Sequence, residues 1–357
     1  MFYNGTMSIK EIVSHFRIKG KFINFVPYGN GHINHSYLVT TTKSQYIVQH
    51  INTKVFKNID ELMENVVLIT DYLRSKNVRT LNFVKTKDNK YLYKEKGCYR
   101  IYDYISEGIA FEQVKNKKMF KNLGNAFGEF QKNLSQFDAS KLHEIIPDFH
   151  NTPKRFMDFD RAVKEDKLGR KADCQKEIKF VYKQRKKIWR IVSGLKRKQI
   201  PLRVAHNDTK LNNVLFDPKT YKPIAVIDLD TVMPGSLLYD FGDAIRYGAS
   251  TGAEDETNLK NVNFSLPLFE AYSEGFLKSL KNKITPTEIS LLPYSSMLMT
   301  FECGMRFLTD YLNGDEYFNI SYPTHNLIRC RTQFKLAYQM EKRANDMSNV
   351  ISKILKK

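Results

Sequence analysis

Two short stretches of the chain place carboxylate and amide side chains directly after strand-like residues. In VAHNDTKLNNVLFD (residues 204–217) the apolar pair leads into His206, Asn207 and Asp208, and in IAVIDLDTVMPG (224–235) the apolar run leads into Asp228. Such residues are poor in a strand interior, but they suit the end of a strand, where the chain turns and side chains project into a cleft. Both stretches therefore predict a functional site.

The residue types and their spacing fit phosphoryl transfer. Asn213 follows Asp208 by five residues, and Asp228 follows it by twenty. Amide and carboxylate oxygens suit Mg²⁺, which takes few protein ligands and completes its shell with water and phosphate oxygens. A remaining Asp can orient a substrate hydroxyl and accept its proton, and Lys210 can neutralise charge on a transferring phosphoryl group.

The pattern His206-x-Asp208-x-Lys210-x-x-Asn213 resembles the catalytic loop of the protein-kinase-like superfamily, in which Asp228 takes the place of the metal-binding Asp. The second block reads IDLD where protein kinases have DFG, and no APE segment follows, which favours the aminoglycoside-phosphotransferase-like group of small-molecule kinases. Within that group, GHINHSYLV, HNDTKLNNVLFD, VIDLDTVMPG, YDFGDAIR and RFLTDYLNGDEYF occur in this order and resemble the N-acetylhexosamine 1-kinases over residues 25–335.

This resemblance implies a role for each residue of the two loops. Asp208 would be the catalytic base, Lys210 would stabilise the transferring charge, and Asn213 and Asp228 would bind Mg²⁺, with ATP as the co-substrate. The implied reaction is phosphorylation of the anomeric (C1) hydroxyl of an N-acetylhexosamine, GlcNAc or GalNAc, to give the sugar 1-phosphate.

The resemblance also implies an ATP site in the first hundred residues. Gly29 and Gly31 lie between two strand-like runs, where glycine lets backbone N–H groups approach phosphates. Gln49 stands where a phosphate-binding Lys is expected, and an amide brings no charge. Glu64 is either the remnant of the Glu that pairs with that Lys or a solvated helix residue. The hinge, whose backbone would pair with adenine, is expected at Asp103, Tyr104 and Ile105.

The sugar side of the site is expected in the larger, second part of the chain. Arg306 and Tyr317 lie in the block RFLTDYLNGDEYF, and an Arg beside an aromatic ring suits sugar hydroxyls and ring faces. The full set of expected sugar-binding residues is Asn207, Arg306, Tyr317 and His32.

Other polar residues of the two loops are interpreted as supports. His206 is expected to hold the loop backbone, and Asp240 and Asp243 in YDFGD are expected to brace the catalytic loop. Asp230 is left open between a place beside the metal and a solvated surface position.

The elements that must position these residues change character along the chain. Residues 22–50 are rich in Tyr, Val and Ile and predict strands, as do 81–86 and 91–105, whereas the apolar spacing in 58–75 predicts one helix. Beyond these, the pattern predicts long helices over 119–137 and 174–198, and helices fill most of the remainder.

The expected fold class is α+β, with a protein-kinase-like two-lobed architecture. Residues 1–105 would form a small β-rich nucleotide-binding lobe with one helix, and residues 106–357 a larger, mainly helical catalytic and substrate-binding lobe.

The chain is basic, with 57 Lys and Arg against 38 Asp and Glu. Nucleic-acid binding is one interpretation of this charge, but Lys is spread along the chain and no zinc-finger, RNP or helix-turn-helix signature accompanies it. We therefore expect a solvated Lys-rich surface. The four separated Cys predict reduced thiols, and we see neither a signal-peptide-like region nor a membrane-spanning run. The expected protein is a cytoplasmic monomer that binds ATP and a sugar, with no nucleic-acid or membrane partner.

Two alternatives remain. A relative with the same fold could phosphorylate an aminoglycoside, choline or another small alcohol, although cationic substrates favour sites with several acids. Gln49 could also indicate a nucleotide-binding scaffold without catalysis, against which the intact Asp208, Asn213 and Asp228 argue.

Overall fold

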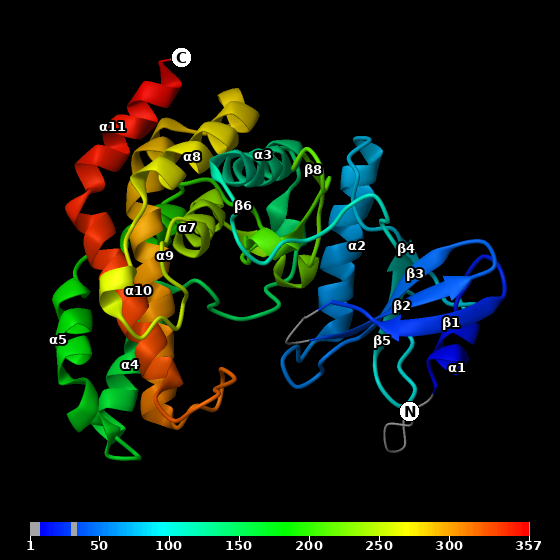
Figure 1. Ribbon diagram of the computed structural model, residues 1–357, viewed down its shortest axis with the longest axis horizontal. Helices are drawn as coiled ribbons and strands as arrows, with labels where there is room; N and C mark the ends of the chain where they lie inside the picture. Colours follow the sequence, from blue (N-terminus) through cyan, green and yellow to red (C-terminus); the bar gives the residue numbers. More distant parts are fainter. Residues whose placement is uncertain (1–7, 30–33, 357) are drawn as a thin grey trace.

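The computed structural model describes residues 8–29 and 34–356 and consists of two lobes side by side (Figure 1). The small lobe contains a five-stranded antiparallel sheet in the order β1-β2-β3-β5-β4. Its strands are β1 (Phe22–Pro27), β2 (His35–Thr41), β3 (Gln45–His50), β4 (Phe83–Val84) and β5 (Tyr99–Asp103), and its helices are α1 (Ile9–Ser14) and α2 (Ile59–Ser75). The long helix and the strands expected in this part of the chain are confirmed, except that the strand expected over 91–105 is limited to Tyr99–Asp103. The short helix α1 was not expected, because only one helix was predicted in the first 105 residues.

The two faces of this sheet have different partners, because successive side chains of a strand point to opposite faces. One face packs on α1 through a cluster that includes Val48 and Ile101. The other face carries Gln49 of β3 and Arg100 of β5, which are paired directly across the two strands. This second face is turned toward the large lobe.

Helix α2 joins the sheet to the large lobe (Figure 1). The face predicted to be apolar is buried, and it consists of Leu62, Val66, Ile69 and Leu73. These side chains share a hydrophobic cluster with residues of α3, β6 and β9 in the large lobe. Asn65 Nδ2 also donates hydrogen bonds to the carbonyl oxygens of His143 (2.8 Å) and Val232 (2.9 Å). The helix is therefore fixed to the large lobe by both apolar and polar contacts.

The large lobe is mainly helical, as expected. Its helices are α3 (Lys117–Asn133), α4 (Thr152–Glu165), α5 (Gln175–Gln184), α6 (Arg190–Lys196), α7 (Leu237–Gly248), α8 (Leu266–Leu280), α9 (Pro286–Asn313), α10 (His325–Lys342) and α11 (Ala344–Leu355). Short 3-10 turns lie at η1 (Ala139–Lys141), η2 (Arg170–Cys174), η3 (Leu211–Asn213), η4 (Leu229–Thr231), η5 (Leu259–Asn261) and η6 (Lys281–Lys283). The α+β two-lobed fold class is confirmed.

Glycines bring α3 and α8 unusually close together. A Cβ atom on Gly124 would lie 2.2 Å from the Tyr272 carbonyl oxygen, and one on Gly275 would lie 2.0 Å from the Lys121 carbonyl oxygen. Only glycine can occupy these positions without moving a backbone. The close packing fixes α3, the helix that also carries Gln131 of the site described below.

The single long helix predicted over 174–198 is wrong, because α5 ends at Gln184 and α6 begins at Arg190. Between them the Lys187 N–H donates to the Gln184 carbonyl at 2.8 Å, a tighter i−3 bond than an α-helix makes. Lys183 and Lys187 would repel each other four residues apart on a continuous helix. In the structure Lys187 instead pairs with Glu341 of α10, which also accepts a hydrogen bond from Gln184.

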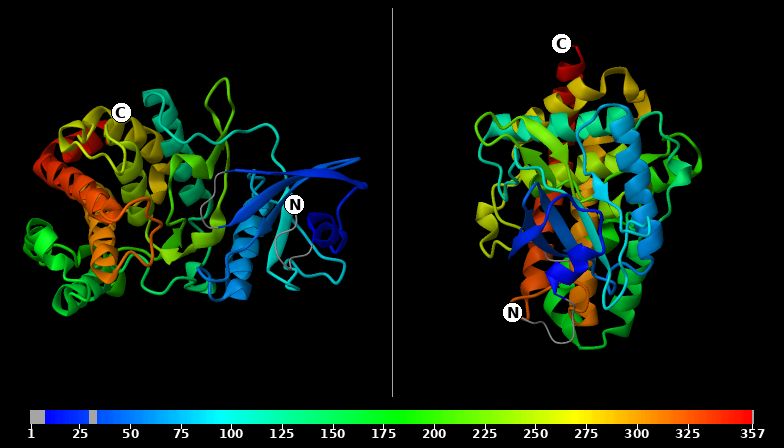
Figure 2. Two further views of the ribbon diagram at one scale, coloured as in Figure 1. Left: turned by 60° about the horizontal axis from the view of Figure 1, so that its bottom comes forward. Right: turned by 90° about the vertical axis from the view of Figure 1, so that its right-hand side faces the viewer.

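Two short antiparallel ribbons lie on the side of the large lobe that faces the small lobe (Figures 1 and 2). They pair β6 (Arg203–Ala205) with β9 (Met233–Gly235), and β7 (Val214–Phe216) with β8 (Pro223–Val226). The connections that leave β6 and β8 contain the two sequence blocks of interest.

All four cysteines lie in the described part of the chain and are free thiols, as predicted. Across residues 8–29 and 34–356, no helix combines the length and the apolar character that a membrane crossing requires.

Candidate active site

The catalytic loop begins with a sharp turn after β6. Asn207 has φ 66°, in the left-handed region that Asn tolerates better than most residues. Its side chain is buried, and Nδ2 donates to the carbonyl oxygen of Thr231 at 2.9 Å. The amide nitrogen thus ties the catalytic loop to the loop after β8, which leaves the side-chain oxygen for the predicted contact with sugar.

Asp240, in the first turn of α7, holds the start of this loop. Its carboxylate accepts hydrogen bonds from the backbone N–H groups of His206 (3.0 Å) and Asn207 (2.8 Å) and from Gln131 Nε2 (2.7 Å). Desolvation raises the pKa of Asp240, and these donors, with His206, act against that rise. The loop is therefore built on a buried acid whose acceptors are all engaged.

Asp243, one turn later on α7, holds the next part of the loop. It accepts from the Thr209 N–H at 3.0 Å and pairs with Arg246 at 2.9 Å. The prediction that Asp240 and Asp243 brace the catalytic loop is confirmed.

His206 is fully buried and connects the two loops. Its Nε2 lies 3.0 Å from the Ile227 carbonyl oxygen, and the Asp208 N–H donates to its Nδ1 at 3.3 Å. Both bonds form together when the proton is on Nε2. The imidazole thus holds backbone, as the sequence predicts.

Asp208 is oriented by two neighbours and remains partly open to solvent. Asn213 Nδ2 donates to its Oδ2 at 2.9 Å and to its carbonyl oxygen at 2.8 Å, and Lys210 Nζ lies 3.0 Å from its Oδ1. The side chain of Asp208 is 28% exposed. Asp208 raises the pKa of Lys210, so the amine stays charged beside an accessible carboxylate.

Asp228 follows β8 and also lies in the left-handed region, with φ 55°. The Ile227 N–H donates to the Asn213 carbonyl oxygen at 2.9 Å, which keeps the two predicted metal-binding residues together. The side chain of Asp228 is exposed to solvent, but atoms of the surrounding protein remove part of its hydration. Desolvation, followed by the neighbouring Asp230 and Asp208 carboxylates, raises its pKa to about 7. A nearby cation would stabilise the ionised form of such a carboxylate.

The donor set fits a magnesium ion. The Nδ2 atom of Asn213 is bonded to Asp208, so its side-chain oxygen is left for a cation beside Asp228. In the part of the chain that the structure describes, no group of three or more His, Cys, Asp or Glu could hold a metal. Two oxygen ligands from the protein suit Mg²⁺, which keeps several waters and phosphate oxygens, better than they suit zinc.

The predicted phosphate contact at Gln49 has a neighbour that sequence reasoning missed. Arg100 Nε and Nη2 both donate to Gln49 Oε1, at 3.0 and 2.8 Å, and Nη2 also lies 2.6 Å from Asp230 Oδ1. Asp230 is thus not a solvated surface residue, because its carboxylate is buried and pairs with Arg100 of the small lobe. An Arg inside the short strand YRIYD was the available signal, because Arg is almost never fully buried without a partner.

Glu64 lies elsewhere, with its side chain 62% exposed and 2.8 Å from His143 Nε2. Of the two interpretations of this acid, the structure supports the solvated helix residue.

The nucleotide side of the site is described in part. Gly29 has φ 76°, as a tight glycine turn requires, whereas Gly31 and His32 lie outside the described residues. In the hinge, the N–H groups of Asp103 and Tyr104 already donate to the carbonyls of Asn82 and Gln45. The Ile105 N–H has no hydrogen-bond partner among the described residues.

Arg306 and Tyr317 come together at a small pocket of about 140 Å³. The Arg306 guanidinium lies 5.1 to 5.6 Å from three aromatic rings, and its Nη2 is 3.4 Å from the Tyr317 hydroxyl. The three rings are Phe149, Tyr317 and Phe318. Aromatic faces around a fixed donor are suited to a sugar ring.

A chain of contacts connects this pocket to the catalytic loop. Phe149, which packs under Arg306, precedes His150, whose ring lies 5.1 Å from that of Tyr239 on α7. His150 Nδ1 also lies 2.7 Å from Glu302 Oε1 of α9. Tyr239 precedes Asp240, so the pocket and the catalytic loop are both anchored on α7.

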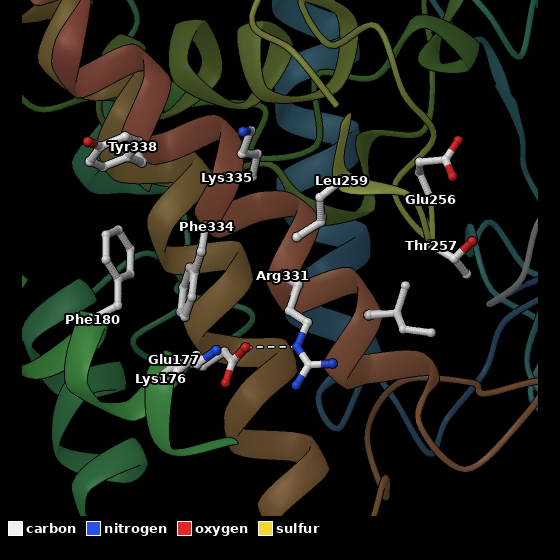
Figure 3. A pocket seen from close by; sticks show the side chains of 11 residues that line it. Lys176, Glu177, Phe180, Glu256, Thr257, Leu259, Arg331, Phe334, Lys335 and Tyr338 are labelled. Carbon is white, nitrogen blue, oxygen red and sulfur yellow. Dashed lines mark hydrogen bonds and ion pairs between the residues drawn. The ribbon is translucent and has the colours of Figure 1, made fainter. Parts of the chain in front are cut away.

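A larger hollow of about 790 Å³ lies away from these loops, between α5, α10 and the segment around η5 (Figure 3). It is lined partly by Phe180, Phe334 and Tyr338, and the ion pair between Arg331 and Glu177 crosses it at 2.7 Å. None of the predicted site residues lines it.

Comparisons with known proteins agree with this arrangement. The pattern of the phosphotransferase enzyme family matches residues 24–273. An aminoglycoside phosphotransferase from Alicyclobacillus acidocaldarius has a similar structure, with 12% identity, a TM-score of 0.61, and coverage of 99% of this chain and 98% of that one.

Two further solved structures are similar. An ethanolamine kinase from Plasmodium vivax shows 17% identity and a TM-score of 0.55, with 87% of this chain and 82% of that one covered. A spectinomycin phosphotransferase in complex with ADP and spectinomycin shows 14% identity and a TM-score of 0.54, with 94% and 98% covered. At these identities the likeness concerns the fold, and it confirms the kinase-like architecture.

Proposed function

We propose that the chain, which belongs to the phosphotransferase enzyme family, phosphorylates the anomeric (C1) hydroxyl of an N-acetylhexosamine, GlcNAc or GalNAc. ATP is the proposed phosphoryl donor. The observation that carries the proposal is the Asp208 carboxylate, oriented by Asn213 at 2.9 Å and Lys210 at 3.0 Å and still accessible to a substrate. An oriented base beside a fixed cation is what phosphoryl transfer to an alcohol requires.

In this mechanism each loop residue has one task. Asp208 positions the sugar hydroxyl and accepts its proton as the new P–O bond forms. Lys210 offsets the charge that develops on the transferring group. Asn213 and Asp228 would hold Mg²⁺, which supplies neutralisation of the phosphate charge when it is bound.

The proposed ATP site lies between the lobes, with the lobe boundary at residues 105 and 106. Gly29 would let backbone approach the phosphates, and the unpaired N–H of Ile105 would meet adenine beside Asp103 and Tyr104. The Tyr28 ring contacts that of Tyr104 edge-on at 5.5 Å, which places the glycine turn next to the hinge.

The pocket around Arg306 favours a neutral sugar over a cationic acceptor. It contains two guanidinium groups, those of Arg155 and Arg306. Its acids are already engaged, because Asp158 pairs with Lys154 at 2.7 Å and Asp310 accepts the N–H groups at positions 317 and 318. A positively charged aminoglycoside, choline or ethanolamine would meet two guanidinium groups there, and only Asp310 has a charge that is not already paired with a lysine.

The proposed compartment, oligomeric state and partners are those expected for a small-molecule kinase that uses cellular ATP. We propose a cytoplasmic monomer without nucleic-acid or membrane partners. Asn207 and His32 are the further proposed sugar contacts, and the reduced state of the four cysteines suits this compartment.

The test is a panel of acceptors assayed for ADP release, with Arg306→Ala and, as control, Arg197→Ala at an exposed position. We expect turnover with GlcNAc and GalNAc. Losing charged hydrogen bonds to the sugar should raise its KM about tenfold or more in Arg306→Ala, with the KM for ATP unchanged. Turnover with kanamycin or choline, and none with either N-acetylhexosamine, would contradict the proposal.

A further inference from the structure

The guanidinium of Arg100 is buried at the junction of the two lobes. Its side chain is only 3% exposed, and it pairs with Asp230 of the large lobe at 2.6 Å. A charge removed from water in this way needs partners for its hydrogen-bonding groups. Nη1 is shielded from solvent and has none among the described residues, and Asp230 Oδ1 also makes no hydrogen bond although it lies 2.6 Å from Nη2. One arm of the guanidinium is therefore left without a protein acceptor.

The position of Arg100 relates it to the nucleotide. Arg100 lies opposite Gln49 in the β3–β5 register, on the sheet face from which it reaches Asp230 of the large lobe. Burial acts to lower the pKa of Arg100, but Asp230 and, more weakly, Asp228 raise it. The guanidinium therefore contacts Gln49, the proposed phosphate contact, and Asp230, which follows the proposed metal ligand Asp228 by two residues.

The neighbours of Arg100 hold it in place and do not replace it. Gln49 uses its Oε1 to accept two bonds from Arg100, and its Nε2 donates to Ser36 Oγ at 3.1 Å. Asp230 Oδ2 accepts a bond from Asn34 Nδ2 at 2.7 Å. Lys210, the cation of the catalytic loop, is already paired with Asp208. The amide at position 49 thus orients a cation and brings no charge itself.

We propose that Arg100 donates from Nη1 to a phosphate oxygen of the bound nucleotide and supplies the positive charge that Gln49 lacks. Gln49 is the positioning residue that fixes the plane of the guanidinium, and Asp230 offsets its charge. This inference rests on the proposed ATP site. The planar fork of Arg suits a phosphate group, and a phosphate would satisfy the unpartnered nitrogen.

The test compares a nucleotide with its phosphate-free nucleoside. Arg100→Met should weaken ADP binding about tenfold or more, as expected for a lost charged hydrogen bond, while adenosine binds as to the wild type. Arg79→Met is the control, since the Arg79 side chain is 56% exposed and lies in the same lobe. Titration calorimetry with ADP, and displacement of a fluorescent ADP analogue by adenosine, measure both affinities. Equal weakening of ADP and adenosine, or no change in either, would overturn the inference.

A second variant separates a phosphate contact from a simple link between the lobes. Asp230→Asn keeps the size of the side chain but removes the charge that now balances Arg100. If Arg100 binds phosphate, this variant should bind ADP more tightly than the wild type and adenosine equally well, because the guanidinium charge is no longer offset by Asp230. An unchanged ADP affinity would count against the inference. If Arg100 only links the lobes, Asp230→Asn should weaken ADP and adenosine together. This comparison decides the matter even where Arg100→Met fails to fold, as judged by its circular dichroism spectrum.

A failure of the inference on Arg100 can be distinguished from a failure of the proposed sugar kinase activity. Wild-type protein that binds ADP but phosphorylates no sugar would contradict the proposed function and leave the inference on Arg100 standing. Wild-type protein that binds no ADP would overturn both.

Discussion

At the scale of single residues, the main feature of the site is that hydrogen bonds restrict the conformation of Asp208. Its backbone N–H is bonded to His206 and its carboxylate to Asn213 and Lys210, so the carboxylate is held in one orientation and is still partly exposed. Preorganisation of this kind removes the need to order the base during the reaction.

Replacing Asp208 by Asn is expected to remove the base while keeping the shape of the loop. The loss of a general base typically lowers kcat by a factor of about 10²–10⁴. Nucleotide affinity should remain close to that of the wild type, because Asp208 acts on the sugar side. Stopped-assay kinetics and ADP titration check both parts. A folded Asp208→Asn protein with wild-type kcat would exclude Asp208 as the base.

Asp228 should make the metal-free protein less stable as the pH rises. Desolvation, Asp230 and Asp208 raise its pKa in the folded state to about 7, whereas an unfolded Asp titrates near ~3.9. Between these values the folded protein holds a proton that the unfolded chain has lost, so the free energy of unfolding falls as the pH increases through this window.

Asp228→Asn should abolish this part of the pH dependence. In EDTA, the variant should melt at a higher temperature than the wild type at pH 8, and the difference should shrink at pH 5. Thermal melts over this range measure it. Parallel curves of Tm against pH for the two proteins would show that Asp228 does not carry a raised pKa.

The sequence correctly predicted that the loop residues lie together, because they are close along the chain. Asp208, Lys210 and Asn213 lie within six positions, and their spacing alone indicates shared contacts, which the structure shows. Arg100 could not be predicted in the same way. Its partners Gln49 and Asp230 are distant in sequence and belong to different lobes, so only the folded chain shows the pairing.

At the scale of elements, the catalytic loop owes its shape to α7 and α3. The buried carboxylate of Asp240 accepts two loop N–H groups and the amide of Gln131, and α3 is held against α8 by glycine contacts. The loop has little regular structure of its own. Its geometry is therefore a property of the helices behind it.

Asp240→Ala should destabilise the protein and lower its activity together. The change leaves the buried N–H groups of His206 and Asn207 without an acceptor and removes one of the two bonds of Gln131 Nε2. At about 1–3 kcal/mol for each unpaired donor, a loss of about 2 kcal/mol or more is expected. Urea denaturation and kcat measure the two effects. The control is Asp71→Ala, an exposed acid on α2 that should change stability little. Unchanged stability in Asp240→Ala would contradict the bracing role.

Helices were predicted correctly where apolar residues recur at a regular helical spacing. The prediction failed where contacts with a distant helix determine the end of a helix. The regular apolar spacing of 58–75 gave one helix, α2, with its buried face as expected. The stretch 174–198 is equally periodic, but it breaks after Gln184, where Gln184 and Lys187 bond to Glu341 of a distant helix. No local pattern reveals that acid.

At the scale of the whole molecule, the two lobes meet through two kinds of contact. Helix α2 is held to the large lobe by apolar packing and by Asn65, whereas the sheet reaches it through the ion pair of Arg100 with Asp230. The proposed nucleotide site lies between these contacts. The proposed sugar pocket at Arg306 is instead formed by residues of the large lobe alone.

The central claim is that the chain transfers phosphate from ATP to the anomeric oxygen of an N-acetylhexosamine. The most direct measurement is ³¹P and ¹H NMR of the product formed from GlcNAc or GalNAc with ATP and Mg²⁺. We expect a single sugar phosphate in which phosphorus couples to the anomeric proton with the coupling of an α-1-phosphate, and no product from the 1-deoxy sugar. Phosphate on O6, or no product with either sugar while kanamycin is phosphorylated, would contradict the claim.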